Sequence, residues 1–364
     1  MISTFFGTIP GTVAVVLVIG GLIFFHELGH FLVARFFKMG VKTFSLGFGP
    51  AVFSFKRGKT VYQVAAVPLG GFVSLVGFSE SSPADVPGEF TAEENFSLRP
   101  AWQRFCVIAA GSLFNLLLAW IICWGIMWTN GRTVIPPVVG EILPHSAAAE
   151  SPLRRGDTII SINGVDISRF GDIPPIIQRS QGNSITIVAR QSSGNLTTFT
   201  LKPTLLSQTT PDGRQVESWG IGIRPGGVKR EAFGFFASAR EGMIEAGNMV
   251  AFTWRALGDL VSRKVAFDNV GGPILIAQAI YTQADRGLIS VLLLAALISV
   301  NLGILNLLPV PVLDGGHLMF LLAEMVGRRP VPVNIQEKAM MVGLFLLISL
   351  MLAATFNDVM RFFK

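Results

Sequence analysis

Four long apolar segments constrain the fold of this 364-residue chain more than any other feature. They run from about Gly11 to Phe37, from Phe105 to Trp128, from Leu288 to about Leu313, and from about Ala339 to Phe356. Each is long enough to cross the roughly 30 Å hydrocarbon core of a bilayer as a helix. Because 51% of the residues are hydrophobic and only 14% are charged, we expect a polytopic α-helical protein with four transmembrane helices in a lipid bilayer.

Basic residues in the loops predict how these segments are oriented. Lys and Arg gather between the first and second segments and again between the third and fourth. Since cytoplasmic loops of membrane proteins carry an excess of these residues, we expect both loops in the cytoplasm and residues 130–287 on the outer side. The net charge of +6 includes no basic cluster interleaved with aromatic residues, so no nucleic-acid partner is expected.

Three regions between the apolar segments have patterns of their own. Alternation around "AVFSFKRGKTVYQVAAV" predicts a β-hairpin with its turn at Lys56 to Lys59, associated with the membrane. Residues 130–228 have short strand patterns, turn residues and one helix pattern near Ile173 to Ser180, typical of a small α+β domain. Residues 229–287 are helical in pattern but charged, which favours amphipathic helices on the outer membrane surface.

The sequence therefore predicts eight consecutive parts. In order, they are a first span (1–38), a cytoplasmic or membrane-reentrant β region and loop (39–104), a second span (105–129), the α+β domain (130–228), the surface helices (229–287), a third span (288–316), a cytoplasmic loop (317–338), and a fourth span with the C-terminus (339–364).

The first apolar segment contains "HELGH", which places His26, Glu27 and His30 at membrane depth. On a helix, residues four apart lie on one face, so both imidazoles can reach one metal ion. Glu27 lies beside them, where it can accept a proton from an attacking water. The alternative is a pair of structural histidines on a bundle face. The cost of placing ionisable groups in lipid favours the metal site.

A catalytic zinc ion needs a third protein ligand and one open position. Asp314, in "NLLPVPVLDGGHL", is the candidate, and His317 is the competing ligand. Two crossings separate the first and third spans, so these run parallel and their C-terminal ends reach the same membrane face. Asp314 then lies at the depth of "HELGH", whereas His317 lies one turn further out. The alternative role for Asp314 is a helix cap before the two glycines.

The combination of "HELGH" in the first span with "LDGG" in the third resembles the site-2 protease family of intramembrane zinc metalloproteases. The stretch "ALISVNLGILNLLPVPVLDGGHL" and the closing "FND" are similar to its bacterial branch of sigma-E regulators. The stretch "VGEILPHSAAAESPLRRGDTIISINGVDI" resembles a circularly permuted bacterial PDZ domain. Three features depart from the family's pattern. One PDZ domain is expected where that branch has two, Ser112 replaces a proline, and His145 replaces a glycine.

The resemblance implies roles for particular residues. It implies that His26, His30 and Asp314 bind Zn²⁺ and that Glu27 is the general base. It implicates Asn306 in substrate handling, for which an interhelical polar contact is the alternative. We also expect Pro309 and Pro311 to break the third span and to free backbone groups near the metal.

The resemblance further implies hydrolysis of a peptide bond within or near the transmembrane segment of single-pass membrane proteins, for example a pre-trimmed anti-sigma factor. It places the chain in a bacterial inner membrane, with the PDZ domain in the periplasm and the active site toward the cytoplasmic half. Because a substrate helix hides its carbonyls, we expect residues 44–76 to offer a sheet edge to the unwound segment.

The sequence leaves several alternatives open. The PDZ domain could bind a newly exposed C-terminus or exclude substrates with bulky outer domains. The whole chain could instead cleave remnant signal peptides, serve as a non-enzymatic PDZ scaffold, or transport a metal ion.

Overall fold

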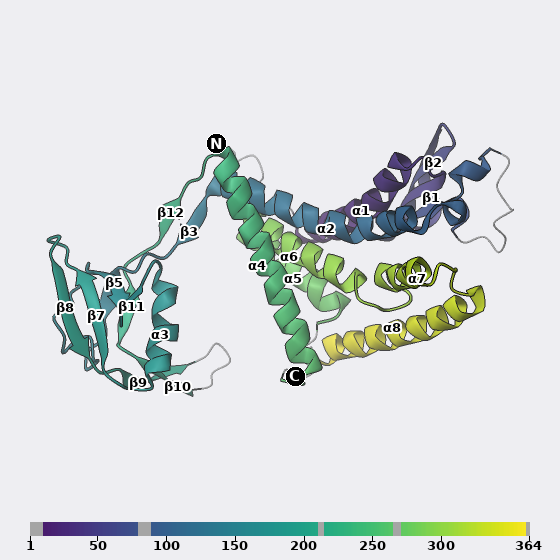
Figure 1. Cartoon of the computed structure of the whole chain (residues 1–364). Helices are drawn as coiled ribbons and strands as arrows, with labels where there is room; N and C mark the ends of the chain where they lie inside the picture. Colours follow the sequence, from purple (N-terminus) through teal and green to yellow (C-terminus); the bar gives the residue numbers. More distant parts are fainter. Residues whose placement is uncertain (1–9, 79–88, 210–214, 265–270, 362–364) are drawn as a thin grey trace. The chain divides into compact units, whose positions relative to one another are not determined.

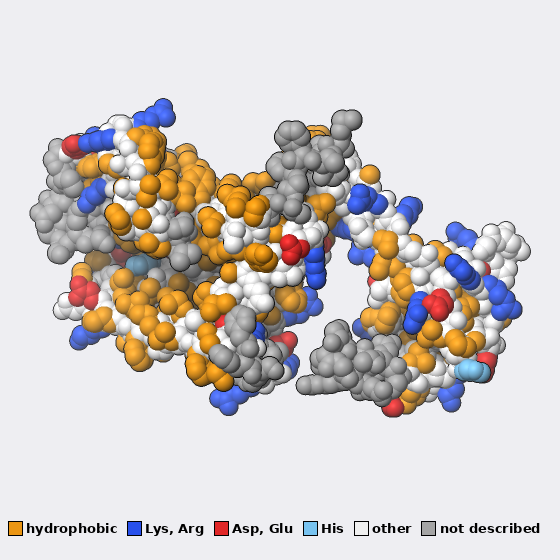
Figure 2. Space-filling model, turned by 180° about the vertical axis from the view of Figure 1, so that it is seen from behind, with side chains coloured by type: hydrophobic (Ala, Val, Ile, Leu, Met, Phe, Trp, Pro, Cys, Tyr) orange, Lys and Arg blue, Asp and Glu red, His pale blue; other side chains and the backbone are white. Residues whose placement is uncertain are grey.

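The computed structural model describes residues 10–78, 89–209, 215–264 and 271–361 (Figure 1). The chain divides into two compact units, one formed by residues 127–234 and the other by the sequence on both sides of it. Within these described residues, four helices are long and apolar enough to cross a membrane: α1 (Gly11–Phe36), α2 (Ala101–Asn130), α6 (Leu288–Asn306) and α8 (Val333–Arg361). Hydrophobic side chains cover much of the surface of the helical unit (Figure 2), as expected for a multi-pass membrane protein.

The third apolar segment is shorter as a helix than the sequence predicted. We expected the span to continue to about Leu313, but α6 ends at Asn306 and is followed by an irregular turn. Pro309 and Pro311 explain the break, because proline cannot donate a backbone hydrogen bond and its ring clashes with the preceding helical turn.

A further helix, α7 (Asp314–Gly327), follows that turn. Residues 317–338 were predicted to be a loop, and the first part of that range is helical instead. The pattern "LMFLLAEMV" explains this helix, since its apolar residues recur at helical spacing. The last helix, α8, begins at Val333, earlier than the predicted residue 339.

The region after α1 contains two long strands, β1 (Val41–Arg57) and β2 (Thr60–Leu75), which form a hairpin turning at residues 58–59. Both strands bend, so that residues 43–46 of β1 pair with residues 61–64 on one side and with residues 71–74 on the other. The result is a small sheet in which residues 71–75 form one margin. Among the described residues, no further strand pairs with that margin.

Two helices, α4 (Phe235–Val261) and α5 (Pro273–Arg286), precede α6. They occupy the region predicted to lie on the membrane surface, and they also pack against the spans. A Cβ at Gly242 would lie 2.6 Å from the backbone nitrogen of Trp124, so α4 and α2 approach closely at a residue with no side chain. The indole of Trp120 donates a hydrogen bond to the carbonyl of Ala239 (3.0 Å) across the same contact.

The second unit, residues 127–234, has a four-stranded sheet in the order β6-β5-β7-β8 and three two-stranded pairs, β3–β12, β4–β11 and β9–β10. The side chains of Ile159, Ile185 and Ile187 are fully buried in its core. Its elements are β3 (Arg132–Val134), β4 (Val139–Ile142), β5 (Thr158–Ile162), β6 (Val165–Asp166), α3 (Ile173–Ser180), β7 (Ile185–Arg190), β8 (Leu196–Leu201), β9 (Thr204–Thr209), β10 (Gln215–Gly220), β11 (Ile223–Pro225) and β12 (Lys229–Glu231).

Candidate metal centre

Helix α1 carries His26 and His30 on one face, as their spacing of four residues predicts. The two imidazole rings lie 4.9 Å apart between centroids, and their Nε2 atoms lie 3.3 Å apart. Gly29, between them in the motif, allows α1 to approach α2, since a Cβ at this position would overlap the backbone of Ala110. The "HELGH" sequence therefore provides both the ring pair and the close helix contact that buries it.

Asp314 reaches the same place from the other end of the chain, at the first residue of α7. Gly315 and Gly316 explain how, because a Cβ on either one would overlap the backbone of the turn between α6 and α7. Residues Leu318 and Leu321 pack α7 against α1 and α2. The "DGG" sequence thus lets the first turn of α7 lie directly on the preceding turn and fixes where the carboxylate points.

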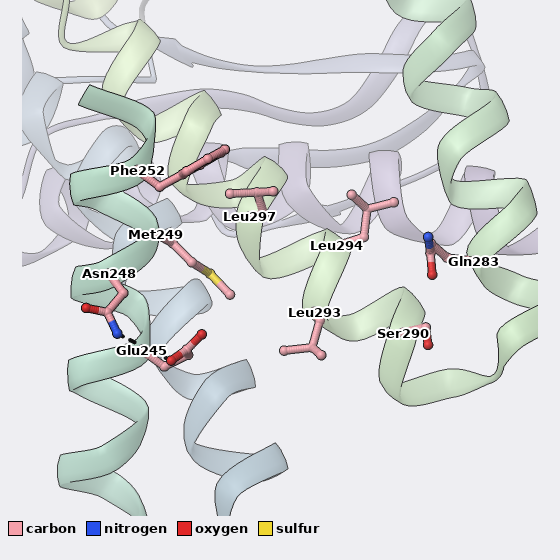
Figure 3. Close-up of a pocket in the computed structure, with 9 residues that line it drawn as sticks. All are labelled: Glu245, Asn248, Met249, Phe252, Gln283, Ser290, Leu293, Leu294 and Leu297. Atoms are coloured by element: carbon pink, nitrogen blue, oxygen red, sulfur yellow. Dashed lines mark hydrogen bonds between the residues drawn. The ribbon is translucent and has the colours of Figure 1, made fainter. Parts of the chain in front are cut away.

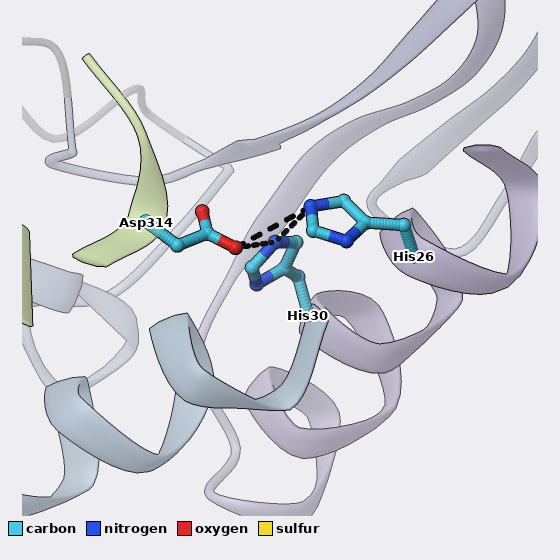
Figure 4. A group of neighbouring side chains, drawn as sticks. All are labelled: His26, His30 and Asp314. Carbon is cyan, nitrogen blue, oxygen red and sulfur yellow. Dashed lines mark hydrogen bonds and ion pairs between the residues drawn. The ribbon is translucent and has the colours of Figure 1, made fainter. Parts of the chain in front are cut away.

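The three side chains converge on one point (Figure 4). Oδ2 of Asp314 lies 3.4 Å from Nε2 of His26 and 3.6 Å from Nε2 of His30. Tetrahedral zinc, with bonds to nitrogen and oxygen of about 2.0–2.2 Å, places its ligand atoms about 3.3 Å from one another. The two nitrogens and one oxygen therefore have both the chemical type and the spacing of a zinc site with its fourth position open.

The Asp314 carboxylate is largely buried beside both histidines, with 17% of its side chain exposed. A divalent cation between the three side chains would favour the ionised carboxylate, because it is the largest local charge in such a site.

Glu27 is a residue of α1, and its side chain extends toward the margin of the β-sheet at residues 71–75. Its carboxylate lies next to the backbone of Val73 in β2. A Cβ at Gly71 would lie 3.2 Å from Cγ of Glu27, so the sheet contacts this side chain at a glycine. The predicted general base is therefore next to both the metal-ligand group and the sheet margin.

Helix α2 supplies polar groups behind the three candidate ligands. The carbonyl of Val107 accepts a hydrogen bond from Nδ1 of His30 at 2.8 Å. The hydroxyl of Ser112 lies 3.4 Å from Oδ2 of Asp314, and the amide of Asn115 lies 3.1 Å from Nδ1 of His26. The contacts to the two rings are made at Nδ1, away from the metal position, whereas Ser112 contacts the carboxylate oxygen that faces the histidines.

Ser112 and Asn115 were not among the predicted site residues. Both occur in "GSLFN", where Ser112 was noted only as a departure from a family pattern. The sequence did contain a signal for them, because these two polar residues, three apart, interrupt an otherwise apolar span. Both are fully buried in the structure.

The remaining predicted residues lie near the site without joining the three-ligand group. The ring of His317 lies 5.4 Å from that of Phe78, and among the described residues the metal-ligand group contains only His26, His30 and Asp314. Burial lowers the pKa of His317, and the nearby His30 lowers it further. The roles predicted for the site residues remain predictions.

Asn306, Pro309 and Pro311 occupy the junction between α6 and α7. Asn306 is the last residue of α6 and is half-buried, and both prolines lie in the turn that leads to Asp314. The turn is short and internally hydrogen-bonded, with the N–H of Leu313 donating to the carbonyl of Val310 at 2.9 Å.

A separate groove of 520 Å³ opens between α4, α5 and α6 (Figure 3). Leucine side chains of α6 line one wall, and Glu245 and Asn248 of α4 line the other. None of the predicted site residues lines it, so it is distinct from the candidate metal centre.

Comparison with known proteins gives one family and several full-length relatives. The model of peptidase family M50 matches residues 14–350. A protein of Agrobacterium fabrum is 35% identical, with 94% of this chain and 94% of the relative covered. A protein of Campylobacter jejuni is 36% identical, with 96% and 93% covered, and one of Rickettsia conorii is 35% identical, with 96% and 98% covered. All three are named putative zinc metalloproteases.

Among solved structures, the PDZ domain of the SdrC-like protein from Listeria monocytogenes aligns with 26% of this chain and 90% of its own length. The sequence identity is 21% and the TM-score is 0.21, which is too low to assign a fold to residues 127–234.

Proposed function

Because the chain belongs to peptidase family M50, the site-2 proteases, it is a zinc metalloprotease, and we propose that it cleaves single-pass membrane proteins within or near their transmembrane segment. The observation that carries this proposal is the convergence of His26, His30 and Asp314, with their ligand atoms 3.3–3.6 Å apart. His26 and His30 lie on the membrane-spanning helix α1, and Asp314 lies at the start of α7, far away in the sequence.

Each residue of the centre has a proposed chemical role. His26, His30 and Asp314 hold the zinc ion. When bound there, Zn²⁺ acts as a Lewis acid and makes hydroxide available near neutral pH. Glu27 accepts the proton of the water that attacks the scissile carbonyl, and it returns that proton to the departing amine as the C–N bond breaks. Glu27 follows His26 directly in α1.

The sheet margin at residues 71–75 is the proposed docking site for the substrate backbone. A transmembrane helix must unwind before its carbonyls can be attacked, and its freed N–H and C=O groups then need partners. An extended peptide can obtain them by pairing with a sheet edge. The contact between Glu27 and this margin, through Val73 and Gly71, supports cleavage of a strand bound there.

Asn306, Pro309 and Pro311 are proposed to act on the other side of the bound strand. Asn306 ends α6, and a side-chain amide at that place can donate to and accept from substrate backbone. The two prolines keep the turn to Asp314 non-helical, which leaves backbone carbonyls available close to the metal centre.

The proposed location is a bacterial inner membrane, with residues 127–234 in the periplasm as a PDZ domain and the metal centre toward the cytoplasmic half. The basic residues of the β region and of the segment between α7 and α8 support this orientation. We propose that the PDZ domain acts as a size filter that excludes substrates with bulky outer domains, so that an anti-sigma factor is cleaved only after trimming.

Cleavage of tagged single-pass segments by the purified protein tests the proposal. The panel contains segments with small and with large outer domains and a remnant signal peptide. Glu27→Gln is expected to abolish cleavage while zinc content, measured by metal analysis, stays at the wild-type level. Asp314→Ala is expected to lose both.

Glu245→Gln is the matched control, since it makes the same change in the separate groove lined by α4 and should leave cleavage intact. Cleavage by Glu27→Gln at the wild-type rate would refute the proposed mechanism. Cleavage of the signal peptide alone would change the substrate class, and equal cleavage of segments with large and small outer domains would refute the size filter.

A further inference from the structure

Asn115 of α2 is a fully buried polar residue whose hydrogen bonding is incomplete as the amide is oriented. Its Nδ2 lies 3.1 Å from Nδ1 of His26. Its Oδ1 is buried and has no hydrogen-bond partner among the described residues. An unpartnered buried acceptor is costly, so its presence beside a candidate metal ligand requires an explanation.

The chemistry of His26 supplies that explanation. Its Nε2 faces His30 and Asp314 at 3.3 and 3.4 Å, which makes Nε2 the atom directed at the metal. A neutral imidazole that offers Nε2 to a metal carries its proton on Nδ1, so Nδ1 becomes a donor and needs an acceptor. With Nδ2 of Asn115 against it, two donors would meet.

A half-turn of the Asn115 amide exchanges its oxygen and nitrogen, which removes the contact between two donors and places Nδ2 where Oδ1 lies now. We infer that Oδ1 of Asn115 accepts the Nδ1–H of His26, and that Asn115 is a positioning residue that fixes the ring of His26 for zinc. This inference rests on the proposed role of His26 as a zinc ligand.

The other histidine is held in the same way. Nδ1 of His30 donates to the carbonyl of Val107, also on α2, at 2.8 Å. Both rings are thus anchored through Nδ1 by acceptors of one helix, while both Nε2 atoms face the metal position. A metal-binding histidine usually has such an acceptor behind it, and that acceptor sets the tautomer and the ring orientation.

The backbone of Asn115 is itself fixed. The hydroxyl of Ser299, on α6, donates to the carbonyl of Asn115 at 2.7 Å, and both residues are fully buried. Gly303 of α6 lies over the next turn of α2, where a Cβ would be 3.0 Å from the carbonyl of Ser112. The side chain of Asn115 therefore extends from a rigid position.

Zinc affinity of the purified full-length protein, measured by competition with a chromogenic chelator, tests the inference without using protease activity. Asn115→Leu keeps the approximate volume and removes the acceptor. It is expected to weaken zinc binding about 10–100-fold, the usual loss for a group that orients a metal ligand. Asn115→Asp retains an acceptor and is expected to stay within a few-fold of wild type.

Thr253→Val is the matched control, because it removes a hydrogen bond between α4 and α6, to Asn301, without touching a ligand or Asn115, and it should leave zinc affinity unchanged. His26→Ala, expected to lose zinc, tests the ligand assignment itself. The inference is overturned if Asn115→Leu binds zinc as tightly as wild type while His26→Ala does not.

Asn115→Asp decides between the two orientations of the amide even if Asn115→Leu does not fold. A carboxylate can accept from Nδ1–H but cannot donate, so affinity close to wild type supports Oδ1 as the acceptor. A loss of 10-fold or more in a folded Asn115→Asp protein overturns it. Retention of zinc by His26→Ala would refute the proposed ligand set rather than the role of Asn115 alone.

Discussion

Gly111 of α2 lies against the two histidine rings, next to Nε2 of His30, and its replacement by alanine should weaken zinc binding without unfolding the protein. A Cβ at this position would overlap Nε2 of His30 and would lie 2.6 Å from Cε1 of the same ring and 2.9 Å from Cε1 of His26, whereas ordinary contact begins at 3.4 Å. The His30 ring would have to move by more than about 0.8 Å, the difference between 3.4 and 2.6 Å, because Nε2 is closer still.

The His30 ring has little freedom to make this movement. Its Nδ1 is bonded to the carbonyl of Val107 at 2.8 Å, and a metal site tolerates ligand displacements of only about 0.2 Å. We therefore expect Gly111→Ala to weaken zinc binding by at least about 10–100-fold. Alanine favours a helix interior over glycine by roughly 0.5–1 kcal/mol, so the helix itself should not be destabilised.

The assay is chelator competition for zinc, together with thermal unfolding in detergent. Gly125→Ala is the control in the same helix, because a Cβ at Gly125 would have nothing within 4 Å. If Gly111→Ala binds zinc as tightly as Gly125→Ala, the packing argument for the metal centre is wrong.

Two further predictions concern stability. Asp358 of α8 accepts hydrogen bonds from the N–H groups of Gly272 (2.9 Å) and Leu275 (3.0 Å) at the start of α5. Asp358→Ala should therefore lower the free energy of unfolding by about 1–2 kcal/mol, and Asp358→Asn should lower it less, as measured by thermal unfolding in detergent. His145 is exposed and has a φ of 56°, a backbone conformation that favours glycine. His145→Gly should therefore stabilise residues 127–234 by about 0.5–1 kcal/mol, as measured by hydrogen exchange of that unit. Unchanged exchange in His145→Gly, or unchanged melting in Asp358→Ala, would contradict them.

The sequence predicted the parts of the centre that depend on local spacing. The repeat of four in "HELGH" placed His26 and His30 on one helix face. The parallel direction of the first and third spans brought Asp314 to the same depth. Helix periodicity is enough to predict the histidine pair, and the number of membrane crossings is enough to predict the depth of Asp314. Side-chain packing is needed for neither.

The sequence could not predict features that depend on close packing between distant segments. The position of Asn115 behind His26 depends on which helix faces the polar side of α2, and the two polar residues Ser112 and Asn115 do not by themselves specify that neighbour. The pairing of residues 43–46 on both sides depends on bends in β1 and β2, and alternation alone suggested a simple hairpin. The helix α7 was missed because charged residues and glycines border a short apolar stretch.

The substrate docking proposed for the sheet margin beside Glu27 has a consequence for selectivity. A surface that binds the main chain of a peptide makes few contacts that depend on its side chains. Discrimination among substrates then depends on the energy needed to unwind the substrate helix. Glycine and proline near the scissile bond lower that energy by roughly 1 and 3 kcal/mol relative to alanine, so they should matter more than any consensus motif.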